Sequence, residues 1–392
     1  MRQSGHFLNR TIWVVSLVSM CTDMAGEMLY PILPLFFQQM GYSGVWAGMI
    51  ESIADAVSGF SKPYFGQWSD RIQQRKPFIQ LGYTISALAK PAMVFFSSIP
   101  ALAFLRSIDR LGKGMRGGAR DALLTDASLP EYRGRVFGFH RSLDTLGAFL
   151  GPLMALLFLH FYPNNYRSLF LWALIPGLLA VLLTFKIKEA IPQSSTPINK
   201  PQVAWCHFWN SSSSHFKMIM LGLGIIACVN SSDMFLLVQA GNMSSAPSNT
   251  LYLYLWYNLI YALCAYPFGQ WSDRIGIKPV LLMGYGLMAM VYFAFTAPLS
   301  NMALYGVFGL YGVYAAATEG LAKAWISQHC PQHHRAQSLG LLSGIQSLGL
   351  LISGSIYVSL SFVDYLHWAF VITAVGCLIG ILVLSLVPQR TL

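Results

Sequence analysis

Charged residues are scarce in this chain. Aspartate, glutamate, lysine and arginine make up 10% of its 392 residues, against 55% apolar residues. Soluble proteins carry about 25% charged residues, so this composition excludes a chain whose whole surface faces water. The length allows twelve membrane-spanning helices, because each needs roughly 20 residues. The apolar runs do not alternate in polarity, which excludes a membrane barrel built from strands.

Motifs for catalysis and metal binding are also lacking. The sequence has no HExxH, GxSxG or Walker A motif, and its six cysteines are scattered without a CxxC pair. We therefore expect no enzyme activity, no cofactor and no metal, although a membrane-embedded enzyme is kept as an alternative. One histidine-rich group is the candidate for a metal cluster if any is present: His329, Cys330, His333 and His334.

The basic residues that give the net charge of +10 are unevenly distributed along the chain. The lysines and arginines outside the apolar segments lie in every second loop and at the chain ends, which are expected on one side of the membrane. The loops expected on the opposite side carry one base, Arg167, and one acid, Asp364. This asymmetry follows the positive-inside rule, so both termini are expected on the cytoplasmic side of a bacterial cytoplasmic (inner) membrane. No basic run is interleaved with stacking aromatics, so no nucleic-acid partner is expected. The first apolar run, from Thr11, leads into a full span, so no cleavable signal is expected.

One heptapeptide, Gly-Gln-Trp-Ser-Asp-Arg-Ile, occurs twice, beginning at Gly66 and at Gly269. Each copy is followed by Lys-Pro and then Gly-Tyr, so the chain is predicted to consist of two equivalent halves. Such duplication in an apolar chain is one way to build a transporter with its site between the halves. The fold class expected is an all-α membrane protein with two pseudo-symmetric six-helix bundles, residues 1–187 and 216–392, joined by a proline- and serine-containing cytoplasmic linker at 188–215. The predicted spans are 11–38, 44–65, 78–98, 101–125, 135–160, 166–187, 216–240, 250–270, 279–298, 301–326, 335–360 and 365–388.

Charged residues nevertheless occur inside these predicted spans. Each costs at least about 2.5–3.5 kcal/mol in hydrocarbon, so we expect them to pair around a buried polar cavity. The bases are Lys62, Lys90, Arg106, Arg110, Lys113, Arg116, Arg120, Arg141 and Lys323, and the acids are Asp23, Glu27, Glu51, Asp55, Asp109, Asp121, Asp144, Asp233 and Glu319. Those near the expected cytoplasmic ends are also interpreted as snorkelling residues or gate ion pairs.

Helical spacing assigns roles to these charges. Arg106, Arg110 and Lys113 fall on one face of a helix, and arginine binds carboxylate or phosphate bidentately. We therefore expect an amphiphilic, anionic or zwitterionic organic substrate. The expected substrate-binding residues are Arg106, Asp109, Arg110, Lys113, Glu51, Asp55, Asp144, Glu319, Lys323, Tyr30 and Tyr311. Proton coupling is assigned to Asp23, Glu27 and Asp233, with pairing or packing as the alternative.

The motif Gly66-x-x-x-Asp70-Arg71-x-x-x-Arg75-Lys76 resembles the loop between helices 2 and 3 of the major facilitator superfamily, and its second copy, Gly269-x-x-x-Asp273-Arg274-x-Gly276-x-Lys278, resembles the loop between helices 8 and 9. The first copy departs from the pattern, because Gln73 stands where glycine is common. The resemblance implies a cytoplasmic gate in which Asp70 lies against the N-terminus of helix 11, favoured by the helix dipole. Asp126 is expected to pair with Arg71 or Arg75. The gate set is Asp70, Arg71, Arg75, Asp126, Asp273 and Arg274.

One further resemblance bears on transport direction. Gly147-x-x-x-Gly151-Pro152 is similar to the antiporter motif of exporters, but lacks its second glycine pair, so ordinary close packing of helices is the alternative. The expectation is therefore a monomeric, proton-coupled secondary active transporter in the lipid bilayer, with export favoured. Import of a carboxylate-rich metabolite or siderophore is the alternative within transport, and a channel or a transport-dead receptor is the alternative outside it.

Overall fold

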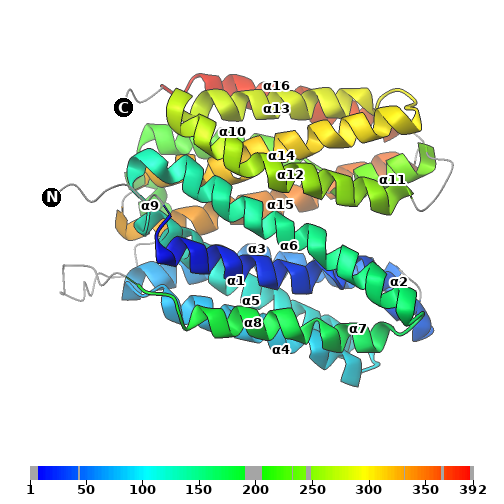
Figure 1. Cartoon of the computed structure of the whole chain (residues 1–392). Coiled ribbons are helices and arrows are strands. Elements are labelled where there is room, and N and C mark those ends of the chain that lie inside the picture. The colour runs from blue at the N-terminus through cyan, green and yellow to red at the C-terminus, as the bar shows by residue number, and fades with distance from the viewer. Residues whose placement is uncertain are drawn as a thin grey trace.

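The computed structural model describes residues 8–42, 45–189, 205–231, 233–243, 249–330, 332–362 and 366–388, and these residues form helices without a strand. The expected all-α fold is confirmed. Two groups of helices lie one above the other with their axes roughly parallel (Figure 1). We call the side on which α1 begins and α16 ends the latch side.

The first group carries the six spans expected for the first half. Its helices are α1 (Arg10–Glu27), α2 (Leu33–Gln39), α3 (Val45–Ile72), α4 (Lys76–Ala92), α5 (Ile99–Asp126), α6 (Arg133–Phe161), α7 (Tyr166–Trp172) and α8 (Leu174–Thr184). The first predicted span is divided into α1 and α2 because Pro31 and Pro34 lack an N–H for the helical ladder. The sixth is divided into α7 and α8 close to Pro176.

The second group repeats this plan. Its helices are α10 (Ser214–Val229), α11 (Asp233–Met243), α12 (Asn249–Ile275), α13 (Ile277–Ala294), α14 (Asn301–His329), α15 (Arg335–Phe362) and α16 (Leu366–Ser385). Between the groups lies α9 (Trp205–Ser211), whose Phe208 is buried against Phe216. The boundaries 187/188 and 215/216 stay predictions, since residues 190–204 lie outside the described part of the chain.

A break interrupts the seventh predicted span between α10 and α11. Asn230 has an extended backbone, so the helix stops at Val229 and restarts at Asp233. The carbonyl oxygens freed there are bonded by hydroxyl groups: Ser353 Oγ donates to Asn230 O at 2.7 Å and Thr373 Oγ1 to Val229 O at 2.7 Å. The break is thus satisfied internally, as hydrocarbon requires.

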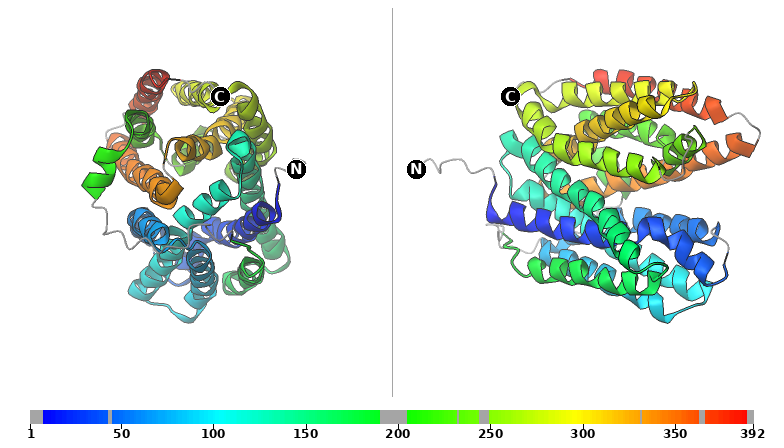
Figure 2. Two further views of the ribbon diagram at one scale, coloured as in Figure 1. Left: turned by 90° about the vertical axis from the view of Figure 1, so that its left-hand side faces the viewer. Right: turned by 45° about the vertical axis from the view of Figure 1, so that its right-hand side comes forward.

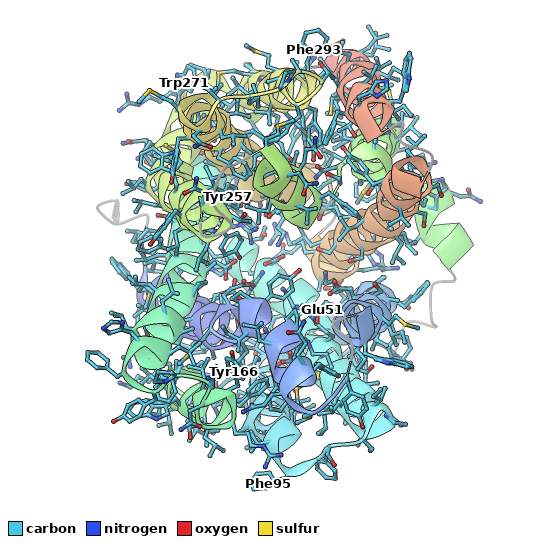
Figure 3. The ribbon with its side chains drawn as sticks, turned by 90° about the vertical axis from the view of Figure 1, so that its right-hand side faces the viewer. Glu51, Phe95, Tyr166, Tyr257, Trp271 and Phe293 are labelled. Atoms are coloured by element: carbon cyan, nitrogen blue, oxygen red, sulfur yellow. The ribbon has the colours of Figure 1, made fainter. Side chains whose placement is uncertain are left out.

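Large apolar side chains cover the outside of the molecule. Phe95 is 77% exposed and Phe293 68% exposed, and they lie at opposite outer edges in the view along the helices, with Glu51 nearer the middle (Figure 3). A soluble protein rarely exposes such a surface, so it faces lipid. By length and composition, six helical segments of the described chain qualify as membrane spans: Arg10–Gln39, Pro130–Phe161, Tyr166–Thr184, Ile277–Ala294, Gln332–Leu360 and His367–Ser385.

The halves meet mainly along two helix pairs, α3 with α15 and α6 with α12 (Figure 2), and α14 and α15 also contact α6 and α5. The pairs are close because glycines face backbone at matching places: a Cβ on Gly66 would clash with the carbonyl oxygen of Ala336, and one on Gly269 with that of Gly134. Gly147 and Gly151 instead face Met20 and Met24 of α1 inside the first half. This contact favours the close-packing interpretation of the Gly147 motif.

Candidate functional site

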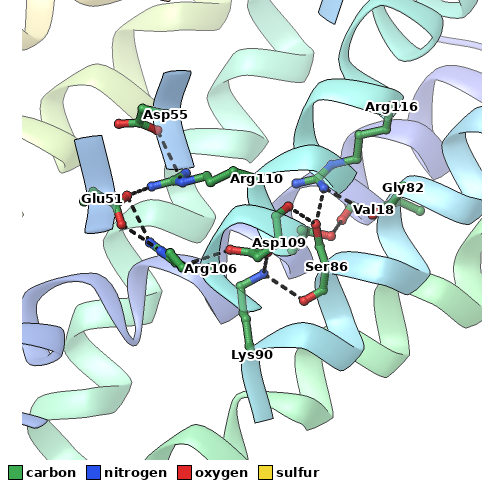
Figure 4. Close-up of polar contacts among 11 residues, drawn as sticks. Val18, Glu51, Asp55, Gly82, Ser86, Lys90, Arg106, Asp109, Arg110 and Arg116 are labelled. Carbon is green, nitrogen blue, oxygen red and sulfur yellow. Dashed lines mark hydrogen bonds and ion pairs between the residues drawn. The ribbon is translucent and has the colours of Figure 1, made fainter. Parts of the chain in front are cut away.

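A buried ion-pair network joins three helices of the first half (Figure 4). Arg106 of α5 binds Glu51 of α3 through Nε at 2.7 Å and through its terminal nitrogen at 3.1 Å, and it binds Asp109 at 2.9 Å. Lys90 of α4 binds the other oxygen of Asp109 at 2.8 Å. Arg106, Asp109 and Lys90 are each at most 5% exposed. Their charges are therefore matched inside the protein, as burial of ions demands.

Arg110 and Lys113 continue the same face of α5 but are placed differently. Arg110 pairs with Glu51 and lies 3.3 Å from Asp55. Lys113 is exposed, and it has no hydrogen bond or ion pair with any residue that the structure describes. Because Lys113 is exposed although it belongs to the interior face of the bundle, the space beside it reaches solvent.

A cavity of about 30 Å³ lies beside these side chains, large enough for about one water molecule. It is lined from α1, α4 and α5 by Thr22, Asp23, Gly26, Glu27, Tyr30, Lys90, Arg106, Asp109, Arg110, Lys113 and Arg116. The structure thus brings two predicted proton-coupling acids and the predicted cation stripe to one place. The spacing of Asp23 and Glu27 already indicated a shared helix face.

The second half presents hydroxyl groups instead of ion pairs. Asp233, at the start of α11, accepts hydrogen bonds from Tyr311 at 2.6 Å and Tyr257 at 3.3 Å. Nearby, Asn230 binds Tyr292 at 3.2 Å and Tyr314 at 3.3 Å. A cavity of about 210 Å³ adjoins this cluster, lined by Leu223, Ile226, Ala227, Asn230, Tyr285, Tyr314, Thr318, Glu319, Gln346 and Leu350.

Three of the expected substrate residues lie in ion pairs that connect the two halves or adjoin such pairs. Lys323 of α14 binds Asp121 of α5 at 2.7 Å, and Glu319 of α14 binds Arg141 of α6. Asp144 also binds Arg141, at 2.8 Å. These contacts hold the halves together in this conformation. Lys323, Glu319 and Asp144 are therefore occupied by protein partners.

Sequence reasoning missed one connection between the halves, made by Tyr254 of α12. Its hydroxyl donates to Glu27 of α1 at 2.8 Å. The signal available was a tyrosine at 254, 257 and 261, a spacing of three and four that places all of them on one helix face. The site therefore includes α12 as well as α1, α3, α5, α11 and α14.

Two latches close the latch side. In the first, Asp70 of α3 accepts from the backbone N–H groups of Ala336 at 3.2 Å and Gln337 at 2.7 Å. Ala336 and Gln337 lie in the first turn of α15, which corresponds to the eleventh predicted span (335–360). The expected contact of Asp70 with the start of that helix is therefore present. Arg75 binds Asp70 at 2.6 Å and lies 3.7 Å from Asp126. Arg75 is thus one partner of Asp126, which also binds Arg335 of α15.

The second latch repeats the first. Asp273 of α12 accepts from the backbone N–H groups of Gly134 at 2.9 Å and Arg135 at 3.1 Å, in the first turn of α6. The other two predicted gate residues differ: Arg71 and Arg274 are exposed and make no ion pair with a described residue. Their expected gate role has no contact to support it in this conformation.

The turn after each latch has a left-handed backbone. Gly276 has φ +95°, which glycine adopts without steric cost, and Gln73 at the same place in the first copy has φ +52°. The Gln73 side chain donates to the carbonyl oxygen of Asp70 at 2.5 Å. The first copy therefore keeps the turn without glycine. No group of three or more metal-ligating side chains occurs in the described ranges.

Comparisons with known proteins agree on one family. The family profile described as Major Facilitator Superfamily matches residues 15–243 and 239–391. An MFS-type transporter of Methanocaldococcus jannaschii is 30% identical over 360 residues, which cover 89% of each chain. The multidrug resistance protein MdtG of Salmonella paratyphi A is 26% identical over 250 residues, 62% of this chain and 58% of that one. The crystal structure of the human organic anion transporter MFSD10 superposes with a TM-score of 0.82 at 15% identity, covering 96% of this chain and 99% of that one.

Proposed function

Since the chain belongs to the Major Facilitator Superfamily, we propose that it is a secondary active transporter for an amphiphilic organic solute that is anionic or zwitterionic. The observation that carries the substrate class is Lys113, an exposed cation on the interior face of α5 that makes no hydrogen bond or ion pair with a described residue. An anionic group of the substrate would supply that partner. The hydroxyl-lined cavity of the second half would take the organic body, because tyrosines offer apolar faces and adaptable hydrogen bonds.

Alternating access follows from where the halves are joined. In this conformation both latches and the pairs Asp121–Lys323 and Arg141–Glu319 tie the halves together. We assign the latch side to the cytoplasm of a bacterial inner membrane, on the positive-inside pattern. The present conformation would then be closed to the cytoplasm. Rocking of the halves would break these ties and open the site to the cytoplasm.

Proton coupling is assigned to Asp23, Glu27 and Asp233. Asp23 and Glu27 line the same cavity as Lys113, so an arriving anion changes their electrostatic surroundings and their proton affinity. We propose export, with antiport of solute against protons; the relative MdtG is named a multidrug resistance protein. Import of a carboxylate-rich metabolite or siderophore uses the same cycle with the opposite gradient. We propose that the monomer is the transporting unit.

A flux assay tests the substrate class. The full-length protein is first screened for thermal stabilisation by metabolites and drugs at two pH values, and the stabilising compounds are then followed in proteoliposomes. We expect Lys113→Gln to weaken transport of an anion about 10- to 100-fold, the loss of one charge-assisted contact. Arg167→Gln, at an exposed base outside the site, is the matched control. Unchanged transport in Lys113→Gln would point to a neutral or cationic substrate. Flux that rises in proportion to the solute gradient without saturating would indicate a channel.

A second assay tests coupling. With an imposed pH gradient, Asp23→Asn is expected to abolish concentrative transport while exchange of solute across the membrane continues, because the amide carries no proton to the other side. Retention of gradient-driven accumulation in Asp23→Asn and in Glu27→Gln would remove both acids from the coupling mechanism.

A further inference from the structure

A second cavity, of about 520 Å³, lies on the latch side, away from the central site. Six charged side chains line it: Arg133, Arg274, Lys278, Arg335, Glu131 and Asp273. Both halves contribute, since Glu131 and Arg133 belong to the start of α6 and its preceding turn, and the others to α12, α13 and α15. The cavity is therefore complete only while the halves touch on this side.

The acids of this cavity leave its positive charge uncompensated. Asp273 is occupied by the N–H groups of the second latch and lies 3.3 Å from Arg135. Glu131 is exposed, where water screens its charge. Arg274 is also exposed and makes no ion pair with a described residue. The excess in the cavity is cationic.

Two guanidinium groups here have unused donors away from water. Arg133 is 6% exposed, and one terminal nitrogen donates to Ser327 O at 2.8 Å, yet its buried Nε has no hydrogen-bond partner. The buried Nε of Arg335 also lacks one, although its terminal nitrogen binds Asp126. A buried donor without a partner is destabilising, because it has lost its hydrogen bond to water. Two such donors beside one cavity indicate a missing acceptor.

We propose that this cavity is a binding site for a phosphate-bearing anion that holds the latch side closed. Arg133, Arg335 and Arg274 bind the phosphate oxygens, and the walls from the two halves make the bound anion a bridge between them. Since the cavity is complete only when the latches are closed, the anion favours that conformation by its differential affinity. The ligand is either a soluble phosphate compound or a phospholipid headgroup, which share this chemistry.

Binding is tested on the full-length protein with inorganic pyrophosphate, in detergent, at an ionic strength held constant with sodium chloride. Pyrophosphate should raise the midpoint of thermal unfolding by about 2 °C or more. The rise should disappear in Arg133→Gln and Arg274→Gln and persist in Arg167→Gln. Arg274 is exposed, so its variant keeps the test valid if Arg133→Gln does not fold.

Two further measurements distinguish the two sources of the phosphate group and test whether its binding closes the latches. The midpoint of thermal unfolding is also compared in nanodiscs of phosphatidylglycerol and of phosphatidylcholine. A higher midpoint in phosphatidylglycerol that depends on Arg133 and Arg274, without any response to pyrophosphate, would assign the site to a phospholipid headgroup. Bound ligand should also slow hydrogen exchange at the latch amides of Gly134 and Gln337. Equal responses in all variants, no response to either probe, or unchanged exchange at the latch amides would overturn the proposal.

Discussion

The two halves of this chain share a plan but differ in the chemistry of their interiors. The first half is held by ion pairs among Glu51, Arg106, Asp109 and Lys90. In the second half, the carboxylate of Asp233 is instead bound by tyrosine hydroxyls. The latches, by contrast, are nearly identical in both halves. The duplicated parts that close the molecule have been kept alike, and the parts facing the site have diverged.

The largest effect should come from the ion pairs of the first half. Asp109→Asn leaves the buried charges of Lys90 and Arg106 without their shared carboxylate, and should lower the free energy of unfolding by about 3–5 kcal/mol. Asp233→Asn keeps an oxygen acceptor for Tyr311 and should cost about 1 kcal/mol. Unfolding of both variants by sodium dodecyl sulfate in mixed micelles measures the difference. Equal losses would show that the two interiors are not held by different forces.

The latches should respond alike, with an intermediate effect. Gly66→Ala and Gly269→Ala each place a methyl group against a carbonyl oxygen of the opposite half, and should destabilise the latch-closed conformation by about 1–3 kcal/mol. Hydrogen exchange at the latch amides of Gln337 and Gly134 measures the opening.

Gly286→Ala is the matched control for these variants, because no atom lies within 4 Å of the added Cβ. If the halves move as rigid bodies, either substitution speeds exchange at both latches. Faster exchange only at the substituted latch would mean that the two closures work independently.

The smallest effect should be at the single hydroxyl that joins Tyr254 to Glu27 across the halves. Tyr254→Phe removes this hydrogen bond and should reduce stability by about 0.5–1.5 kcal/mol. A double-mutant cycle with Glu27→Ala, which removes the acceptor, isolates the pair. Tyr252→Phe, on the same helix at an exposed position, is the control. A coupling energy of zero in the cycle would show that this hydrogen bond does not help to hold the two halves together.

The sequence was sufficient for much of the fold because its signals are local. Each predicted span corresponds to a helix or to a pair of helices divided by a break, and the prolines account for the break after α1. The contact between Asp70 and the start of α15 was expected from the repeated motif. The break at Asn230 was not foreseen, since no proline marks it and the freed carbonyls are bonded from distant helices.

The site was harder to predict, because periodicity places a residue on a face of its own helix without naming what faces it. Arg106 and Lys113 share one face of α5, yet the first is paired within the first half and the second is not. The same limit hid the partners of Glu319 and Lys323, which were expected to bind substrate. They instead bind Arg141 and Asp121 of the opposite half.

The interruption before α11 has a mechanical consequence. The hydroxyl groups of Ser353 in α15 and Thr373 in α16 donate hydrogen bonds to the backbone carbonyl oxygens at this break. Because the break is held by hydrogen bonds from two neighbouring helices, it does not act as a hinge, and α11 would move with α15 and α16 as one rigid body. Asp233, at the start of α11, would then shift together with its whole bundle, and its carboxylate would meet new groups of the first half while α11 keeps its position relative to α15 and α16.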